Sequence, residues 1–165
     1  MKTKILTIIS FVMAFTCYAN AQSVNKQKTE TTTSLALHKV KIICENYKYF
    51  IADSLTGKHI KDLSNYDSVW DFSQGFACVK LFNKWGFIDS SGKEIVTPKY
   101  DKVYSFSEGL ASVKLDRKWG FIDTTGKEVI ALKYDNAFGF SNGLAIVELG
   151  GRSFKIDKTG NEVIP

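Results

Sequence analysis

Short stretches in which apolar and polar residues alternate recur along this chain at a fixed spacing. In residues 111–115, three apolar residues alternate with Ser112 and Lys114, which is the period of a strand with one buried face. Residues 119–123 are rich in aromatic and β-branched side chains and predict a second strand, reached through a short connection. A third strand is expected at residues 127–130. The pattern predicts a three-stranded antiparallel meander.

Turn signals separate the second and third expected strands. Asp123 has a carboxylate that can accept hydrogen bonds from its own downstream backbone, and Gly126, three residues later, can adopt a positive φ. Residues 100–109 then carry the chain across to the next meander. Because residues 40–165 show no sustained helical periodicity, the predicted fold class is all-β, with helix only near the N-terminus.

The meander is repeated with a period of 34 residues. When residues 66–99 are laid over residues 100–133, 20 of the 34 paired positions are identical, and residues 134–165 form a further copy. The matched columns include Phe72, Phe106 and Phe140; Gly75, Gly109 and Gly143; Val79, Val113 and Val147; and Asp89, Asp123 and Asp157.

A weaker copy occupies residues 37–65, and both outer copies depart from the pattern at the same two columns. The glycine of the central copies, Gly120 in one of them, is Phe50 in the first copy and Phe154 in the last. The tryptophan before it becomes Tyr49 and Ser153. Divergent end units are expected in a repeat array, whose terminal faces have no neighbour.

These units resemble the bacterial WG-repeat family. The resemblance rests on Glu108-Gly109-Leu110-Ala111, on Lys118-Trp119-Gly120-Phe121-Ile122-Asp123, on Gly126 with Val129-Ile130, and on the equivalent residues Gly75, Lys84 to Asp89 and Gly92. It covers residues 66–165 well and residues 40–65 loosely. The resemblance implies a tandem β-repeat architecture, but no particular activity, because the family is defined by repetition.

Two arrangements of the units are compatible with this period: an open stack of meanders and a four-bladed propeller-like ring. A closed ring would place the two divergent ends against each other. The sequence therefore favours the open stack.

The N-terminus has the layout of a cleavable secretory signal. Residues 1–21 combine Lys2 and Lys4 with an apolar stretch and end in Ala19-Asn20-Ala21, so a secreted or periplasmic protein beginning at Gln22 is expected. The residues before Cys17 do not fit a lipidation box, so no lipid anchor is expected. No segment is apolar for the roughly 20 residues of a membrane-spanning helix. Residues 22–36 are polar throughout and predict a flexible tether.

The charge pattern excludes nucleic acid as an expected partner. Loss of residues 1–21 removes two lysines and no acid, so the net charge falls from +5 to +3. The remaining lysines alternate with acids, and no basic face is predicted.

The mature chain carries no recognisable catalytic, cofactor-binding or metal-binding set, and the sequence predicts a protein that is not an enzyme. Its only histidines, His38 and His59, have no metal-ligand spacing to a cysteine. The recurrent aspartates occupy turn positions in every unit, which favours a structural role. Calcium is not expected, because each such turn offers one carboxylate beside a lysine.

One aromatic column is the candidate ligand contact. Trp70, Tyr104 and Phe138 are aromatic in every full unit, yet they vary in type and lie in the polar crossing segment. Two interpretations stay open: core side chains, or a ladder of exposed rings that stacks on successive sugars or contacts an extended peptide.

Three functions follow from this pattern. The first is a binding or scaffold module for a protein or glycan partner. The second is a structural envelope protein that self-assembles through free sheet edges. A more remote third is an accessory to cell-wall hydrolysis, which only the expected localisation favours.

Cys44 and Cys78 are not expected to form a disulfide with each other. The repeat register places them two positions apart on equivalent strands of successive units. Stacked sheets lie about 10 Å apart, whereas a disulfide needs Cα atoms within about 7 Å. A slipped register in the first unit is the alternative that would join them.

Overall fold

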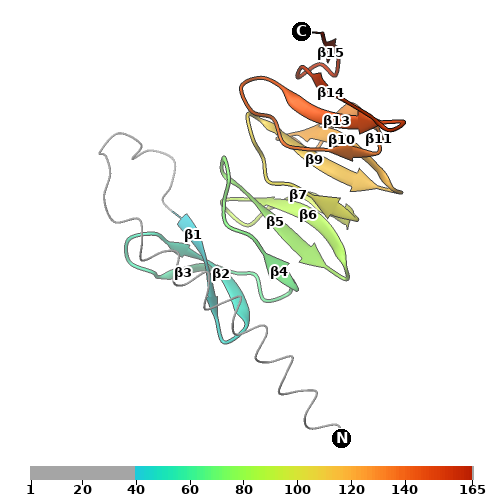
Figure 1. The fold of residues 1–165 in the computed structure, drawn as a ribbon. Coiled ribbons are helices and arrows are strands. Elements are labelled where there is room, and N and C mark those ends of the chain that lie inside the picture. Colours follow the sequence, from blue (N-terminus) through green and yellow to red (C-terminus); the bar gives the residue numbers. More distant parts are fainter. Residues whose placement is uncertain (1–39, 165) are drawn as a thin grey trace, which may run out of the picture.

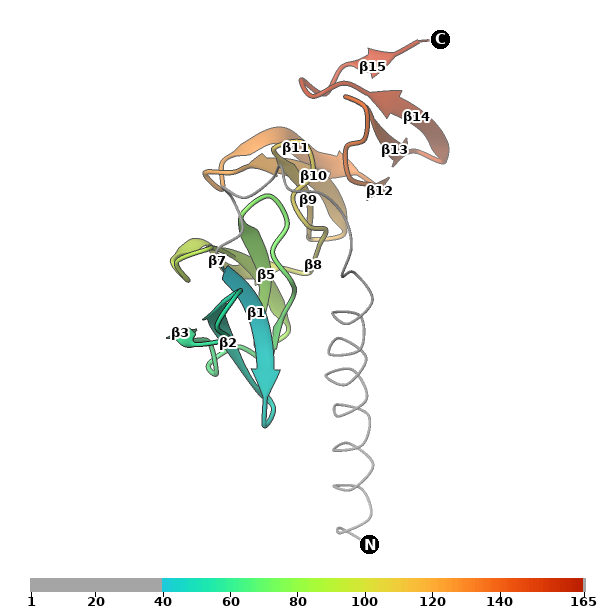
Figure 2. The same ribbon diagram turned by 90° about the vertical axis from the view of Figure 1, so that its left-hand side faces the viewer.

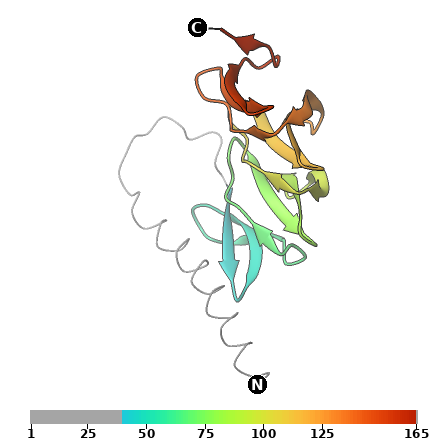
Figure 3. The same cartoon turned by 45° about the vertical axis from the view of Figure 1, so that its right-hand side comes forward.

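The computed structural model describes residues 40–164, in which all regular structure is antiparallel β-sheet. Four small sheets follow one another along the chain and stack as an open array (Figure 1). The views in Figure 2 and Figure 3 place the first and last sheets at opposite ends. The all-β class and the open stack are therefore confirmed, and the ring is not formed. The expected signal peptide, the tether and residues 37–39 lie outside the described residues.

Each of the last three sheets contains four strands, and the first contains three. The first sheet is β1 (Val40–Glu45), β2 (Lys48–Asp53) and β3 (His59–Asp62). The second is β4 (Ser68–Val69), β5 (Phe76–Leu81), β6 (Lys84–Asp89) and β7 (Glu94–Tyr100). The third is β8 (Lys102–Val103), β9 (Leu110–Leu115), β10 (Lys118–Asp123) and β11 (Glu128–Tyr134). The fourth is β12 (Asn136–Ala137), β13 (Ala145–Leu149), β14 (Arg152–Ile156) and β15 (Glu162–Val163).

The prediction of three strands per full unit is wrong by one short strand. In the third unit the crossing segment supplies β8, whose Val103 pairs with Val113 of β9. This pairing satisfies backbone groups along the free edge of β9, which would otherwise lack partners beside the buried interface. Two-residue strands are too short to produce a detectable alternation in sequence.

The prediction of one buried face per sheet is also wrong for the inner sheets. Ser112, expected on an exposed face, is fully buried, as are its strand neighbours Ala111 and Val113. The reason is stacking, because each inner sheet lies between two others and both of its faces are covered. A polar residue in the alternation therefore does not mark solvent here.

Three apolar clusters, one between each pair of neighbouring sheets, form the core. The first joins Ile51 and Leu63 to Ala77, Val79 and Ile88. The second joins residues of the second and third sheets: Cys78, Phe87, Val96, Tyr100, Val103, Phe106, Ala111, Val113 and Ile122. The third joins residues of the third and fourth sheets: Leu110, Trp119, Phe121, Ile130, Tyr134, Ala137, Phe140, Ala145, Val147 and Ile156.

The third strand of each central unit is longer than predicted and is bulged. β11 extends to Tyr134, which pairs with Trp119, while Phe121 pairs with Ile130, so the register shifts between the two pairs. The extra residues of β11 lie over Gly120, where a Cβ atom would stand 2.5 Å from the Ile130 carbonyl oxygen. The glycine column therefore provides room for a bulged neighbouring backbone.

Cys78 is a free, buried thiol in the core between the second and third sheets. The prediction that it forms no disulfide with Cys44 is confirmed.

Candidate functional site

Trp70, Tyr104 and Phe138, named here the aromatic ladder, lie at the edge of the stack. Each follows directly after the short first strand of its sheet, β4, β8 or β12. Their exposed fractions are 37%, 41% and 44%. Of the two interpretations of this column, the structure therefore favours exposed rings over core side chains.

The ladder rings are supported from within the protein. Trp70 packs against Trp85 with ring centroids 4.7 Å apart, and Tyr104 stacks on Trp119 at 5.5 Å. Tyr104 also contacts Phe138 of the next unit at 6.4 Å. These contacts restrict the rings while leaving part of each accessible, so a ligand would meet preorganised aromatic surfaces.

Lysine ammonium groups lie over the rings of the tryptophans that support the ladder. The Lys80 ammonium lies 5.6 Å from the centre of the Trp85 ring, and the Lys114 ammonium lies 5.8 Å from that of Trp119. Both distances are within the range of cation–π attraction. The ladder is thus bordered by positive charge in the second and third units.

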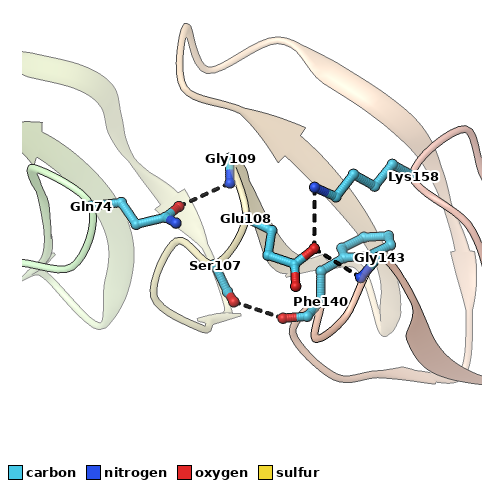
Figure 4. A network of polar contacts seen from close by, with 7 residues as sticks. All are labelled: Gln74, Ser107, Glu108, Gly109, Phe140, Gly143 and Lys158. Atoms are coloured by element: carbon cyan, nitrogen blue, oxygen red, sulfur yellow. Dashed lines mark hydrogen bonds and ion pairs between the residues drawn. The ribbon is translucent and has the colours of Figure 1, made fainter.

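A second recurrent feature is a pair of polar side chains that holds the next unit, named here the inter-unit clamp (Figure 4). In the third unit, Ser107 Oγ donates to the Phe140 carbonyl at 2.6 Å, and Glu108 Oε2 accepts from the Gly143 amide at 3.0 Å. Lys158 adds an ion pair of 3.1 Å to the same Glu108 oxygen.

The second unit repeats the clamp on the third. Ser73 Oγ donates to the Phe106 carbonyl at 2.8 Å, and Gln74 Oε1 accepts from the Gly109 amide at 2.8 Å. Each clamp satisfies backbone groups of the following unit and fixes its position on the stack.

The recurrent aspartates are engaged in structure, which agrees with the turn role predicted for them. Asp123 Oδ1 accepts hydrogen bonds from the Thr125 hydroxyl and amide and from the Lys127 amide. The Thr125 side chain is the largest cause that lowers the pKa of Asp123. The other column behaves similarly, because Asp101 binds the Lys84 ammonium at 2.6 Å, and that bond lowers the pKa of Asp101.

The outward face of the fourth sheet carries a pocket of about 250 Å³, named here the terminal pocket. It begins at the last ladder ring and is lined by Phe138, Gly139, Ser141, Asn142, Leu144, Ile146 and Lys155. Ile146 is 46% exposed, although its equivalents Cys78 and Ser112 are buried by the next sheet. This pocket was not predicted from the sequence.

The divergent residues of the last unit explain why the outward face of the fourth sheet can remain exposed to solvent. Ser153 and Lys155, both exposed, replace Trp119 and Phe121, which pack against the fourth sheet. Phe154, which replaces Gly120, instead packs on the inward cluster. The Phe121 to Lys155 change was the sequence signal that could have located the terminal pocket, because it removes an aromatic side chain from an interface column.

Other reactive groups are isolated from one another. Cys78 is buried, which raises the pKa of its thiol to about 12. His59 pairs with Glu45 at 3.2 Å and stacks on Phe50. Within residues 40–164, no three His, Cys, Asp or Glu side chains are grouped as metal ligands. The same residues include no helix that is long and apolar enough to cross a membrane.

Comparison with known proteins adds one finding. A family model described as "WG containing repeat" matches three consecutive segments, residues 63–85, 85–119 and 119–152. No curated protein matches the chain.

Proposed function

The chain belongs to the WG-repeat family, and we propose that it is an exported, non-enzymatic binding module whose repeated surface contacts a glycan or protein partner. The observation that carries the proposal is the aromatic ladder, in which three exposed rings recur once per unit along one edge of the stack. A surface that repeats in this way suits a ligand that is itself extended and repetitive.

A glycan is the ligand class that the ladder favours. Trp70 and Tyr104 are each packed against a tryptophan of their own unit, so the rings are restricted before any ligand arrives. Restricted aromatic rings provide contact area at a small cost in side-chain entropy. Sugar rings present apolar C–H faces at regular intervals, and such faces stack on aromatic rings.

The non-enzymatic part of the proposal is supported by the roles of the acids. The carboxylates that recur in each unit accept hydrogen bonds from turns, or bind lysines of the preceding unit, as in the 2.6 Å contact between Asp135 and Lys118. Groups committed in this way are poorly placed for proton transfer to a substrate.

Self-assembly through sheet edges is the alternative function. The long edge strand β7 contains Pro98, which has no N–H to donate, and its Lys99 is exposed. Both residues disfavour pairing of this edge strand with a strand of another chain. The β7 edge therefore weighs against this alternative, and the ladder remains the favoured contact surface.

Export is proposed from residues 1–21, whose layout is that of a secretory signal. Mass spectrometry of the protein recovered from the periplasm or medium is expected to find a mature chain beginning at Gln22. A chain that starts at a diacylated Cys17, or one that keeps Met1, would contradict this part of the proposal.

The ladder can be tested with defined oligomers. Titration of the mature protein with chitohexaose, cellohexaose and poly-L-proline, followed by tryptophan fluorescence and calorimetry, is expected to show saturable binding of a hexasaccharide. Tyr104→Ala should weaken that binding by about fivefold, a loss of about 1 kcal/mol, because it removes the contact area of one ring.

Phe82→Ala provides the matched control. Phe82 is an aromatic residue that is 85% exposed at a hairpin turn outside the ladder. Its loss should leave binding unchanged. Saturable binding of poly-L-proline alone would replace the glycan by a peptide, and no saturable binding, or equal effects of the two substitutions, would refute the role of the ladder.

A further inference from the structure

The terminal pocket has an occupied counterpart between the second and third sheets. A shift of 68 residues, two repeat periods, carries the residues that line the pocket onto Trp70, Asp71, Ser73, Gln74, Phe76, Cys78 and Phe87. Of these, Cys78 and Phe87 belong to the core shared by the second and third sheets. The pocket is therefore the open form of a surface that the chain covers elsewhere.

The group that fills the counterpart is Phe106 of the third unit. Its ring lies 4.7 Å from that of Phe76 and 5.0 Å from that of Phe87. The inter-unit clamp binds the same turn, because Ser73 donates to the Phe106 carbonyl and Gln74 accepts from the amide three residues later. One ring and two backbone groups are thus recognised together.

The third unit receives Phe140 in the same way. The Phe140 ring lies 5.0 Å from that of Phe121, and the Phe140 carbonyl accepts from Ser107. Glu108 accepts from the amide of Gly143, again three residues beyond the phenylalanine. Two successive interfaces therefore use one mode of recognition.

The last unit keeps the elements of this recognition. Ser141 and Asn142 occupy the two clamp positions and are exposed, while Leu144 and Ile146 supply apolar wall. The volume of about 250 Å³ is ample for a phenyl ring, since a cavity of about 150 Å³ holds benzene. Lys155 takes the place of Phe87 and Phe121 and can contact an incoming ring by cation–π attraction.

We propose that the terminal pocket is a docking site for a partner protein that inserts a phenylalanine carried on a tight turn of the Phe-Ser-x-Gly type. The phenylalanine ring would fill the space between Leu144 and Ile146. Its carbonyl would accept from Ser141, and the amide three residues later would donate to Asn142. This inference does not depend on the ladder as a ligand surface, although Phe138 borders both.

A second copy of the chain is a poor source of such a turn. Phe106 and Phe140 are each 2% exposed, and their turns are held by the clamps of their own chain. Phe72, in the remaining turn of this type, packs on the cluster between the first and second sheets. The partner is therefore a different protein that presents an unoccupied turn.

A cyclic peptide that contains residues 103–112 of this chain, Val-Tyr-Ser-Phe-Ser-Glu-Gly-Leu-Ala-Ser, is a suitable probe of the full mature protein. We expect saturable methyl chemical-shift changes at Leu144 and Ile146 in NMR titrations. The same peptide with alanine in place of its phenylalanine should bind at least about tenfold more weakly, a loss of about 1.4 kcal/mol.

Protein variants locate the binding. Ile146→Asp should weaken peptide binding by about tenfold or more, a loss of about 1.4 kcal/mol. Leu149→Asp, the same substitution at a residue of β13 that is 40% exposed and outside the pocket, should leave binding unchanged. Paired Ser141→Ala and Asn142→Ala substitutions should weaken binding severalfold. Trp70→Ala, which removes a ladder ring two units away from the pocket, should have no effect, which separates this site from the ladder.

Three outcomes would overturn the proposal. The first is an absence of saturable shifts with the cyclic peptide, and the second is equal binding of the alanine peptide. The third is concentration-dependent self-association, detected by sedimentation and abolished by Ile146→Asp but not by Leu149→Asp. That result would make a second copy, and not another protein, the occupant of the pocket.

Discussion

Gly120 lies directly beneath the backbone of Ile130, so closely that a Cβ atom on Gly120 would stand 2.5 Å from the Ile130 carbonyl oxygen. The same relationship joins Gly86 to the Val96 carbonyl oxygen in the second unit. In the outer units, where phenylalanine replaces this glycine, β3 and β15 are shorter than the seven-residue third strands of the central units. The glycine and the register shift opposite it therefore occur together in the central units, whereas the first unit has a register shift only between Ile51 and Ala52.

Gly120→Val is expected to destabilise the protein strongly. The new side chain would collide with backbone that cannot move without breaking the pairing of β10 and β11, and overpacking of this kind costs about 1–3 kcal/mol. Lys127→Ala is the control in the same unit, since Lys127 is exposed and its effect should stay within about 0.5 kcal/mol. Urea unfolding of both variants measures the difference, and equal midpoints would contradict the steric explanation.

Ser112→Ala and Ser107→Ala should change the stability of the fold in opposite directions. Ser112 is fully buried, and its hydroxyl has no hydrogen-bond partner among residues 40–164. Removing an unsatisfied hydroxyl should stabilise the fold by roughly 1 kcal/mol. Ser107 donates to the Phe140 carbonyl, so Ser107→Ala should destabilise by a similar amount. Chemical denaturation tests both signs, and loss of stability in Ser112→Ala would show that its hydroxyl is satisfied.

The hairpin between β9 and β10 should be stabilised by Arg117→Gly. Asp116 and Arg117 have φ values of 49° and 70°, whereas the last unit has Gly150 and Gly151 at the same positions. A left-handed conformation costs about 1–2 kcal/mol for a residue with a Cβ atom, against an entropic cost of about 0.5–1 kcal/mol for glycine. The melting temperature should rise for Arg117→Gly but not for Arg117→Ala, which retains the Cβ atom.

Stability should fall in acid. Hydrogen bonds from turn hydroxyl and amide groups lower the pKa of Asp123 and of Asp157 below the ordinary value. Because the pKa is lower in the folded state, the stabilisation is complete above the unfolded-state pKa of about 3.9 and is lost as the pH falls through the folded-state pKa. Melting temperatures measured from pH 6 down to about pH 3 should show the loss. Asp123→Asn, which cannot titrate, should reduce the slope.

Cys78 should not react with thiol reagents in the folded protein. Its side chain is 1% exposed, and burial raises the pKa of the thiol to about 12, so almost no thiolate is present at neutral pH. Labelling of the unreduced protein is expected only after unfolding. Rapid labelling of Cys78 under native conditions would indicate that the interface between the second and third sheets opens.

Much of the architecture was predictable because each unit must use the same local signals. The Asp123 to Gly126 turn, the second strand and the all-β class follow from turn chemistry and from residue types that depend on near neighbours. The divergence of Ser153 from the tryptophan column also marked the outer face of the fourth sheet, which lacks the neighbour that a tryptophan would pack against, whereas Tyr49 packs on the cluster between the first and second sheets.

Contacts between units were decided only by the tertiary structure. Three features depend on which sheet faces are in contact: the burial of Ser112, the short strand β8 and the clamp from Ser107 to Phe140. The local alternation of apolar and polar residues does not determine these contacts. The terminal pocket is the clearest case, because its residues are spread from Phe138 to Lys155. The sequence determined the repeating unit, whose strands and turns depend on short-range interactions. Stacking decided which surfaces are covered and which remain open, since burial depends on residues far apart in the chain.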